Sequence, residues 1–240
     1  MTKAIILSAG QGLRLLPLTE NVPKAALPAG RQSILEWQLE ELSKTETTEV
    51  VVITGFGADT IDQIVDRQNY LNCRTLYNPF YSSSDNLGTC WVAKVEMMAP
   101  YLLINGDTLF QSAIATQLLE TEENYPITIV TDSKAQYDED DMKVLTNGNQ
   151  LLRVGKKMDV NGRQVDGESI GMTRFNEEGA NLFKNKLDYM MRYRSGSNQW
   201  YLAAIDELAQ EGKGTTCKIK GSTWCEVDDG DDLTHAKQVV

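Results

Sequence analysis

Short apolar runs alternate with amphipathic segments along this chain, and the alternation predicts strands separated by helices. The predicted strands of the first half are residues 4–7, 49–54, 73–77, 101–105 and 127–130. The predicted helices between them are residues 33–43, 59–68, 87–98 and 111–121. Strands that are apolar throughout are buried on both faces, so we expect a mostly parallel mixed sheet with helices on each side.

Two local signals place the starts of helices. Ser33 and Glu36 stand three residues apart at the start of an amphipathic run, and this spacing predicts a capping box. Asp59 is expected to cap the next helix, because aspartate accepts hydrogen bonds from the first free N–H groups of a helix.

After Asp132 the pattern changes, and strands become more frequent. Residues 142–154 predict a hairpin, with Asn147 and Gly148 as its turn. The later predicted elements are a strand at 169–175, helices at 176–193 and 200–210, and short strands at 215–219 and 224–227. No linker, internal repeat or low-complexity segment interrupts them. We therefore expect one α/β domain over residues 1–240, with the late strands extending the same sheet.

The first 24 residues carry the clearest chemistry. The strand at 4–7 ends in a loop with Gly10 and Gly12, whose backbone can approach a ligand closely and direct N–H groups at it. Arg14 and Lys24 add positive charge, and this combination suits a triphosphate. A Walker loop is excluded because Leu13 follows the second glycine where that motif has lysine. A dinucleotide fingerprint is excluded because Leu15 stands in place of its third glycine.

Composition narrows the class of protein. The formal net charge of −11 argues against nucleic acid and anionic membranes as partners, and it requires local cations or a metal wherever an anion binds. No apolar run approaches the length of a membrane span, so we expect no membrane insertion and a cytoplasmic protein. The four cysteines form no C-x-x-C pair, and His235 is the one histidine, so we expect reduced thiols and no zinc site.

Residues 7–24, LSAGQGLRLLPLTENVPK, resemble the signature of the nucleoside-triphosphate transferase family. That family includes sugar-1-phosphate nucleotidyltransferases and bacterial phosphocholine cytidylyltransferases, and the cytidylyltransferase branch is the more similar. The resemblance implies a three-layer α/β/α Rossmann-like nucleotidyltransferase fold. It also implies a nucleotide-binding part at about 1–132 and an acceptor-binding part at about 133–240.

Two aspartates follow predicted strands, where ligands of open α/β sheets bind. Asp107 follows the strand at 101–105, and Asp228 follows the last short strand. Taken alone, Asp107 would be a turn residue and Asp228 a helix cap. The resemblance instead implies that both bind Mg²⁺ or Mn²⁺, which suits carboxylate ligands beside a triphosphate. It further implies that Lys24 contacts the α-phosphate and that Arg14 holds the β- and γ-phosphates.

The resemblance also implies which residues contact the nucleotide. The backbone of the first loop would surround the phosphates through Leu7, Ser8, Ala9, Gly10, Gln11 and Gly12. The polar loop at 78–88 would read the base through Asn78, Asp85, Asn86 and Gly88. A helix cap with a turn is the alternative interpretation of that loop. Its Asn-Leu-Gly-Thr run resembles the cytidylyltransferases, so CTP is favoured over UTP.

The acceptor side is assigned by the same resemblance to Lys143, Lys156, Glu168 and Trp200. The two lysines would hold an acceptor phosphate, although each is equally well a solvated surface charge. The acidic run at 138–141 is a candidate contact for a cationic head group such as choline. Trp91, Tyr189, Trp200 and Tyr201 are candidates for an aromatic wall around that group, and core packing is the alternative.

The resulting functional hypothesis is a cytidylyltransferase. It would transfer CMP from CTP to a small phosphorylated or phosphonylated acceptor, such as choline phosphate, and release pyrophosphate. Such a product would be a precursor for cell-surface biosynthesis, and a homodimer is left open. The alternatives are a sugar-1-phosphate uridylyl- or thymidylyltransferase, a guanylyltransferase of the molybdopterin-cofactor type, and a nucleotide-sensing module that catalyses nothing.

Overall fold

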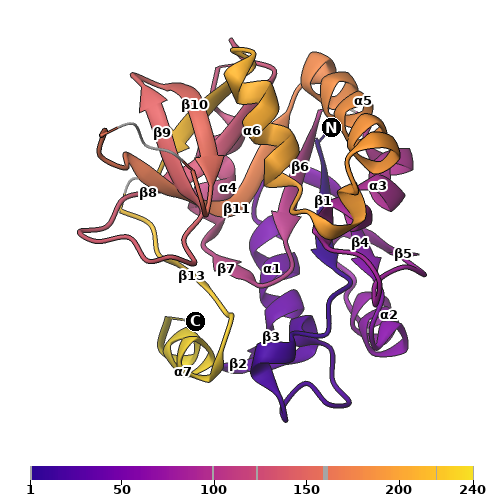
Figure 1. Cartoon of the computed structure of the whole chain (residues 1–240). Helices are drawn as coiled ribbons and strands as arrows, with labels where there is room; N and C mark the ends of the chain where they lie inside the picture. The colour runs from indigo at the N-terminus through magenta and orange to yellow at the C-terminus, as the bar shows by residue number, and fades with distance from the viewer. Residues whose placement is uncertain (1, 99, 123, 159–161, 220, 240) are drawn as a thin grey trace.

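A nine-stranded mixed sheet runs through the whole molecule (Figure 1). The computed structural model describes residues 2–98, 100–122, 124–158, 162–219 and 221–239. The strand order is β5-β4-β1-β6-β11-β8-β12-β10-β9. The bounds are β1 Thr2–Ser8, β4 Thr47–Thr54, β5 Asn72–Tyr77, β6 Tyr101–Asn105, β8 Ile127–Asp132, β9 Lys143–Asn147, β10 Gln150–Gly155, β11 Gly167–Phe175 and β12 Gly214–Lys218.

The direction of the strands agrees with the expected mostly parallel sheet. The strands β5, β4, β1 and β6 are paired in parallel, as are β8 and β12. Among the strands of this sheet, β10 and β11 run against the other seven: β11 is antiparallel to β6, β8 and β9, and β10 is antiparallel to β12 and β9. The hairpin predicted around Asn147 and Gly148 is confirmed as β9 and β10.

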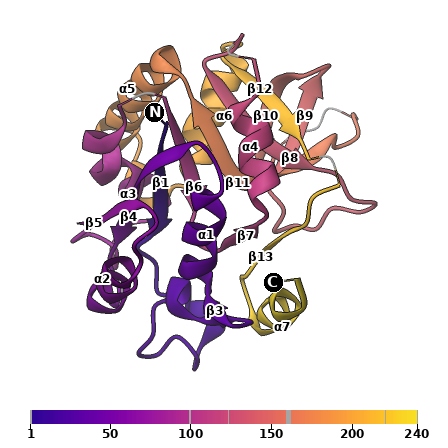
Figure 2. The same ribbon diagram turned by 180° about the vertical axis from the view of Figure 1, so that it is seen from behind.

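Two layers of helices cover the sheet, which confirms the three-layer fold. One face packs against α3 (Asn86–Ala93), α5 (Glu177–Tyr193) and α6 (Leu202–Gln210), as Figure 1 shows. The opposite face packs against α1 (Ile34–Ser43), α2 (Ala58–Arg67) and α4 (Ser112–Leu119), as Figure 2 shows. Both faces of β1 are buried, because Ile5 points into one core and Ile6 into the other.

A third, smaller core lies beyond the carboxyl ends of the central strands. Here β7 (Thr108–Phe110) pairs with β13 (Trp224–Glu226), and α7 (Gly230–Val239) follows. The short strands β2 (Pro28–Ala29) and β3 (Gln32–Ser33) form another pair. Leu15, Leu27, Val227 and Leu233 are buried together in this core. It therefore joins the first loop of the chain to its last helix.

Four short 3₁₀ helices complete the described elements. They are η1 Leu13–Leu15, η2 Lys24–Ala26, η3 Lys94–Glu96 and η4 Gly196–Asn198. None of the described helices combines the length and the apolar character that crossing a membrane requires.

The structure confirms one predicted helix cap and corrects three other details. The capping box of Ser33 and Glu36 is present at the start of α1. Asp59 does not cap α2, because Gly57 in a left-handed conformation is the N-cap and Asp59 lies in the first turn. The predicted helix at 87–98 ends at Ala93 and continues as η3. The last strand, β13, pairs with β7 rather than extending the main sheet.

Candidate active site

The loop after β1 has the irregular backbone that its glycines predict. Gly12 has a φ of +80°, a conformation that is strained for other residues. A Cβ atom at Gly12 would also lie 3.0 Å from the Cβ of Lys24. The Thr19 hydroxyl donates to the carbonyl of Gly12 at 2.8 Å and fixes the loop. The loop continues into η1 rather than an α-helix, as the prolines predicted.

Gly106 brings the end of β6 against the end of β1. Its N–H donates to the carbonyl of Leu7 at 3.1 Å. A Cβ atom at Gly106 would lie 2.4 Å from that same oxygen, so a side chain is excluded unless the backbone moves. Asp107 is thereby held at the mouth of the glycine loop.

Asp228 reaches Asp107 through the small sheet of β7 and β13. The N–H of Val227 donates to the carbonyl of Asp107 at 3.1 Å, and Glu226 pairs with Thr108. The two aspartates meet as expected, but the reason is this added sheet rather than a strand end of the main sheet. Asp229, and not Asp228, caps α7, since its carboxylate accepts from the N–H groups of Asp231 and Asp232. The carboxylate of Asp228 thus faces the site.

Lys24 connects the two aspartates. Its Nζ lies 2.8 Å from a carboxylate oxygen of Asp107 and 2.8 Å from one of Asp228. Arg14 also contacts Asp228, at 2.6 Å. Burial alone would lower the pKa of Lys24, but the charges of Asp107 and Asp228 outweigh it and raise the pKa. Burial would likewise raise the pKa of Asp228, and Lys24 and Arg14 outweigh it and lower the pKa.

A third carboxylate completes an acidic cluster. Carboxylate oxygens of Asp107, Glu226 and Asp228 all lie within 4.8 Å of one another. Burial, with the charges of the two aspartates, raises the pKa of Glu226 to about 8. Such mutual repulsion is relieved when a cation binds. Asp107 Oδ1 is buried with no hydrogen-bond partner among the described residues, so one ligand oxygen stands free. This donor set fits Mg²⁺, which takes hard oxygen ligands and keeps open positions for substrate.

The first-loop residues predicted to contact a nucleotide surround two adjoining cavities. One of about 400 Å³ is lined by loop residues and by Asp85 and Asn86. The other, of about 210 Å³, adds Ser8 and Asp107. The loop residues that line one or both are Leu7, Ser8, Ala9, Gly10, Gln11 and Gly12. The Ser8 hydroxyl, like Asp107 Oδ1, is buried without a partner in the described part of the chain.

Asn78 and Gly88, which were expected to contact the base, hold the loop at 78–88 in shape instead of lining a cavity. Asn78 is fully buried, donates to the Thr89 hydroxyl at 3.1 Å and accepts from the N–H of Phe80 at 2.9 Å. A Cβ atom at Gly88 would lie 2.7 Å from the Cβ of Ser84. Neither residue lines a cavity of the site. Their backbone and side-chain contacts shape the loop that presents Asp85.

Of the residues assigned to the acceptor, Lys156 and Trp200 reach the site. Both line a further cavity of about 210 Å³ that also contains Asp107 and Asp228. Lys156 Nζ lies 3.1 Å from Asp140 and 4.5 Å from the centre of the Trp200 ring.

The other two acceptor assignments do not line these cavities as predicted, and both side chains have structural contacts. Lys143 donates to the backbone carbonyls of Asp138 and Lys156. Glu168 is buried and lies 3.2 Å from Lys134. Lys143 thus connects the segment before β9 to the end of β10, and Glu168 connects that segment to the start of β11.

The aromatic wall expected around a cationic head group is incomplete. Trp200 and Tyr201 line the cavity, but the Tyr201 hydroxyl is turned to Asn105, 3.1 Å away. Trp91 donates to Asp188 at 2.7 Å, and the ring of Tyr189 packs at an angle against that of Tyr193 on α5; neither lines these cavities.

Sequence reasoning missed Asn105 and Glu226, which line the same cavity, whereas Asp140, which also lines it, belongs to the acidic run singled out at 138–141. Both stand within two residues of a predicted metal ligand. The pairing of β7 with β13 brings Glu226 to the site, and no local pattern in the sequence carries that information.

Comparisons with known proteins identify the family of the chain. A family model described as nucleotidyl transferase matches residues 3–143. The chain is 29% identical over 116 residues to choline-phosphate cytidylyltransferase of Streptococcus pneumoniae, a match that covers 48% of this chain and 49% of that protein. It is 21% identical to CTP:phosphoglutamine cytidylyltransferase of Campylobacter jejuni, covering 96% of this chain and 97% of that protein. The chain thus spans about half the length of the first relative and nearly all of the second.

A solved structure shares the fold along the full length. The structure of CTP:phosphocholine cytidylyltransferase from Streptococcus pneumoniae matches with a TM-score of 0.79 and 19% identity, covering 99% of this chain and 98% of that one. At this identity the match confirms the predicted α/β/α fold and leaves the substrate open.

Proposed function

This chain belongs to the nucleotidyl transferase family, and we propose that it transfers CMP from CTP to a small phosphorylated or phosphonylated acceptor, with release of pyrophosphate. The observation that carries the proposal is Lys24, clamped between Asp107 and Asp228 at the mouth of the glycine loop. Cationic side chains, carboxylates for a metal and free backbone N–H groups are the parts that phosphoryl transfer requires.

The reaction needs no general base, because the acceptor phosphate is already an anion. One of its oxygens attacks the α-phosphorus in line, and pyrophosphate leaves. The protein must therefore hold two anions in contact and neutralise their charge. In this assignment Lys24 stabilises charge on the α-phosphate, while Arg14 and the loop N–H groups hold the β- and γ-phosphates. Mg²⁺ on Asp107 and Asp228, beside Glu226, would supply further neutralising charge.

Asp85 supports the choice of CTP. Its carboxylate is exposed at the cavity of the glycine loop, and no hydrogen bond engages it among the described residues. A carboxylate accepts a hydrogen bond from the exocyclic amine of cytosine, whereas the corresponding oxygen of uracil would repel it. The two cytidylyltransferases among the relatives point to the same nucleotide.

The test is pyrophosphate release with Mg²⁺ for CTP, UTP, dTTP and GTP, each against choline phosphate, aminoethylphosphonate, inositol 1-phosphate and glucose 1-phosphate. We expect CTP to give the highest kcat/KM, and Asp228→Asn or excess chelator to abolish turnover. Highest turnover with UTP or dTTP and glucose 1-phosphate would establish the sugar-nucleotide alternative. Nucleotide binding without turnover on any acceptor would establish the sensing module.

A further inference from the structure

A further cavity adjoins the site, and the proposed chemistry uses only residues at its edge, Asp85 and Trp200. It measures about 540 Å³ and lies between β10, α6 and the segment around η4. Its volume falls within the range of small-molecule sites. Trp200, Met142 and Leu202 line both this cavity and the one that contains Lys156, Asp107 and Asp228. A ligand whose phosphate lies beside Lys156 can therefore extend past Trp200 into it.

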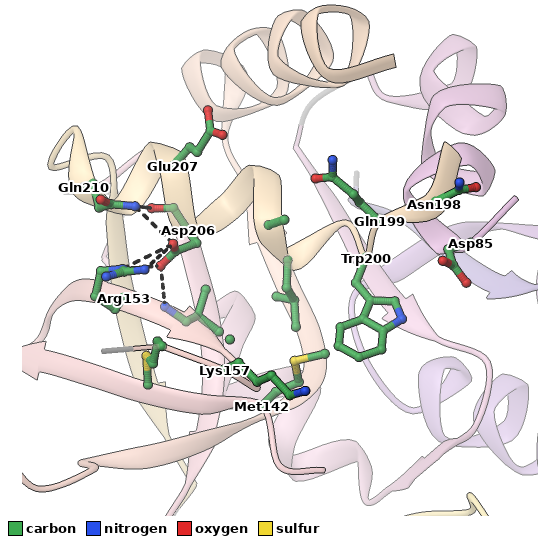
Figure 3. Close-up of a pocket in the computed structure, with 15 residues that line it drawn as sticks. Asp85, Met142, Arg153, Lys157, Asn198, Gln199, Trp200, Asp206, Glu207 and Gln210 are labelled. Carbon is green, nitrogen blue, oxygen red and sulfur yellow. Dashed lines mark hydrogen bonds and ion pairs between the residues drawn. The ribbon is translucent and has the colours of Figure 1, made fainter. Parts of the chain in front are cut away.

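The walls of this cavity are part apolar and part polar (Figure 3). Met142, Trp200 and Leu202, with Val154 and Ala203, offer an apolar surface suited to a short carbon chain. Figure 3 shows Arg153, Asp206 and Gln210 at one end, Asp85 at the other, and Lys157 below the indole of Trp200 in that view.

The acidic groups at the Arg153 end already have cationic partners. Asp206 lies 2.9 Å from Arg153 and accepts from the N–H of Val154 at 2.8 Å. Glu207 lies 3.1 Å from Lys186 and 3.3 Å from Arg194. These carboxylates are therefore poor receptors for a further cation.

Lys157, unlike these carboxylates, has no partner of opposite charge among the described residues. Its ammonium has no hydrogen bond or ion pair within the part of the chain that the structure describes, although it lines the cavity. The neighbouring Lys156 is occupied by Asp140 and by the face of Trp200. Among the described residues, the exposed Lys157 thus brings an unpaired positive charge to this cavity, while the unpaired carboxylate of Asp85 lies at the end of the cavity away from Arg153.

We propose that this cavity binds the distal part of the acceptor, and that Lys157 selects an acceptor whose tail carries an anionic group such as a carboxylate. This inference rests on the proposed function, because it places the acceptor phosphate beside Lys156. The apolar wall covers the carbon chain, and the ammonium of Lys157 donates to the terminal anion. A quaternary ammonium tail would meet two lysines, and Lys156 already covers the Trp200 face that it would need.

The test uses acceptors that share a phosphate end and differ in the tail. Glycerate 3-phosphate and glycerol 3-phosphate have carbon chains of the same length, and a carboxylate in the first replaces a hydroxymethyl group in the second; choline phosphate carries a cation. We expect glycerate 3-phosphate to be used with a kcat/KM about tenfold higher than the other two acceptors, the effect of one partly screened charge-assisted hydrogen bond. Lys157→Gln should remove this preference, and the control Lys237→Gln, at an exposed lysine on α7, should retain it.

A binding measurement separates this inference from the transferase activity. Trp200 lines the cavity and is partly exposed, so a bound acceptor changes its fluorescence. We expect glycerate 3-phosphate to change the fluorescence of the wild type and of Lys237→Gln, and to bind Lys157→Gln at least tenfold more weakly. This result supports binding of the acceptor in the cavity even if no turnover is found. Equal binding to Lys157→Gln and wild type, or a preference for choline phosphate in both, would overturn the inference.

Discussion

At the scale of single residues, Lys24 holds the two carboxylates that a divalent cation would also use. Its ammonium is 2.8 Å from an oxygen of Asp107 and from one of Asp228, so a cation bound by both aspartates competes with Lys24 for their negative charge. A triphosphate offers Lys24 and Arg14 new partners of opposite charge. Metal and nucleotide should therefore each strengthen the binding of the other, and by linkage the two effects are equal.

Replacing Lys24 by methionine keeps much of the length of the side chain and removes its charge. We expect Lys24→Met to bind Mn²⁺ more tightly than wild type in the absence of nucleotide, by about tenfold or more, because no ammonium competes. Titration followed by electron paramagnetic resonance measures this without turnover. The same variant should lose roughly 10²–10³ in kcat. Weaker Mn²⁺ binding by Lys24→Met would mean that Lys24 does not compete with the metal.

Asp85 provides a second prediction at this scale. Asp85→Asn presents an amide that can donate to uracil as well as accept from cytosine. We expect the ratio of kcat/KM for CTP over UTP to fall by roughly tenfold or more, since repulsion between two acceptor oxygens no longer penalises UTP. Asp59→Asn, an exposed aspartate on α2, is the control. An unchanged ratio in Asp85→Asn would place base recognition elsewhere.

At the scale of elements, the glycine loop is held by its contact with η2. Gly12 and Gly148 both have positive φ, of +80° and +60°, so alanine at either position costs about 1 kcal/mol of stability. A Cβ atom at Gly12 also presses on Lys24, whereas one at Gly148 meets nothing within 4 Å. We expect Gly12→Ala to lose at least as much stability in urea unfolding as Gly148→Ala. Turnover should fall only in Gly12→Ala, because only that change displaces Lys24. An equal fall in both variants would refute the idea that the contact between Gly12 and Lys24 positions Lys24 for the reaction.

The end of α3 is attached to the sheet through Glu96 in η3. Glu96 contacts Arg74 of β5 and lies 3.0 Å from Lys3 of β1. The hydrogen bond from Arg74 lowers the pKa of Glu96 more than burial raises it, and Lys3 lowers it further. A carboxyl whose pKa is lowered in the native state stabilises the fold at pH values above its ordinary pKa of 4.5. That contribution is lost as the pH falls through the native pKa.

We therefore expect Glu96→Gln to cost about 1 kcal/mol of unfolding free energy at neutral pH, a value discounted because Arg74 is partly exposed. The difference from wild type should shrink steadily between about pH 5 and about pH 3. Urea unfolding across this range measures it. Glu46→Gln, at an exposed glutamate, should match the wild type throughout. A loss that stays constant with pH would show that ionisation of Glu96 is not its source.

Elements with strong local signals could be predicted, and those decided by distant contacts could not. Apolar runs gave the central strands, and the spacing of Ser33 and Glu36 gave the start of α1 correctly. Asp59 was misplaced because a left-handed glycine served as the N-cap. β13 was assigned to the wrong sheet because its three residues pair with β7, more than 100 positions away in sequence. The same pairing brings Glu226 to the site, which explains why that residue was missed.

At the scale of the whole molecule, the two parts of the chain are interleaved in one sheet. Strands from the two sides of residue 132 alternate at its centre, in the order β6, β11, β8 and β12. Periodicity predicted that these strands exist, but their order depends on which neighbours bury the most apolar surface. Because neither part forms a continuous sheet by itself, we expect the predicted nucleotide-binding and acceptor-binding parts to unfold together.

Phe175 on β11 tests this coupling. It is fully buried, and its ring lies 4.8 Å from those of Tyr101 and Phe183, so it packs elements from both parts. Phe175→Ala should cost about 3–5 kcal/mol, the typical effect of truncating a buried phenylalanine. Cys90 on α3 and Cys217 on β12 are buried reporters on the two sides of residue 132. Pulsed alkylation in urea, resolved by peptide mass, should show both thiols reacting at one midpoint, lowered equally by Phe175→Ala. Reaction of Cys217 at a clearly lower urea concentration than Cys90 would mean that the sheet separates into two independently stable parts.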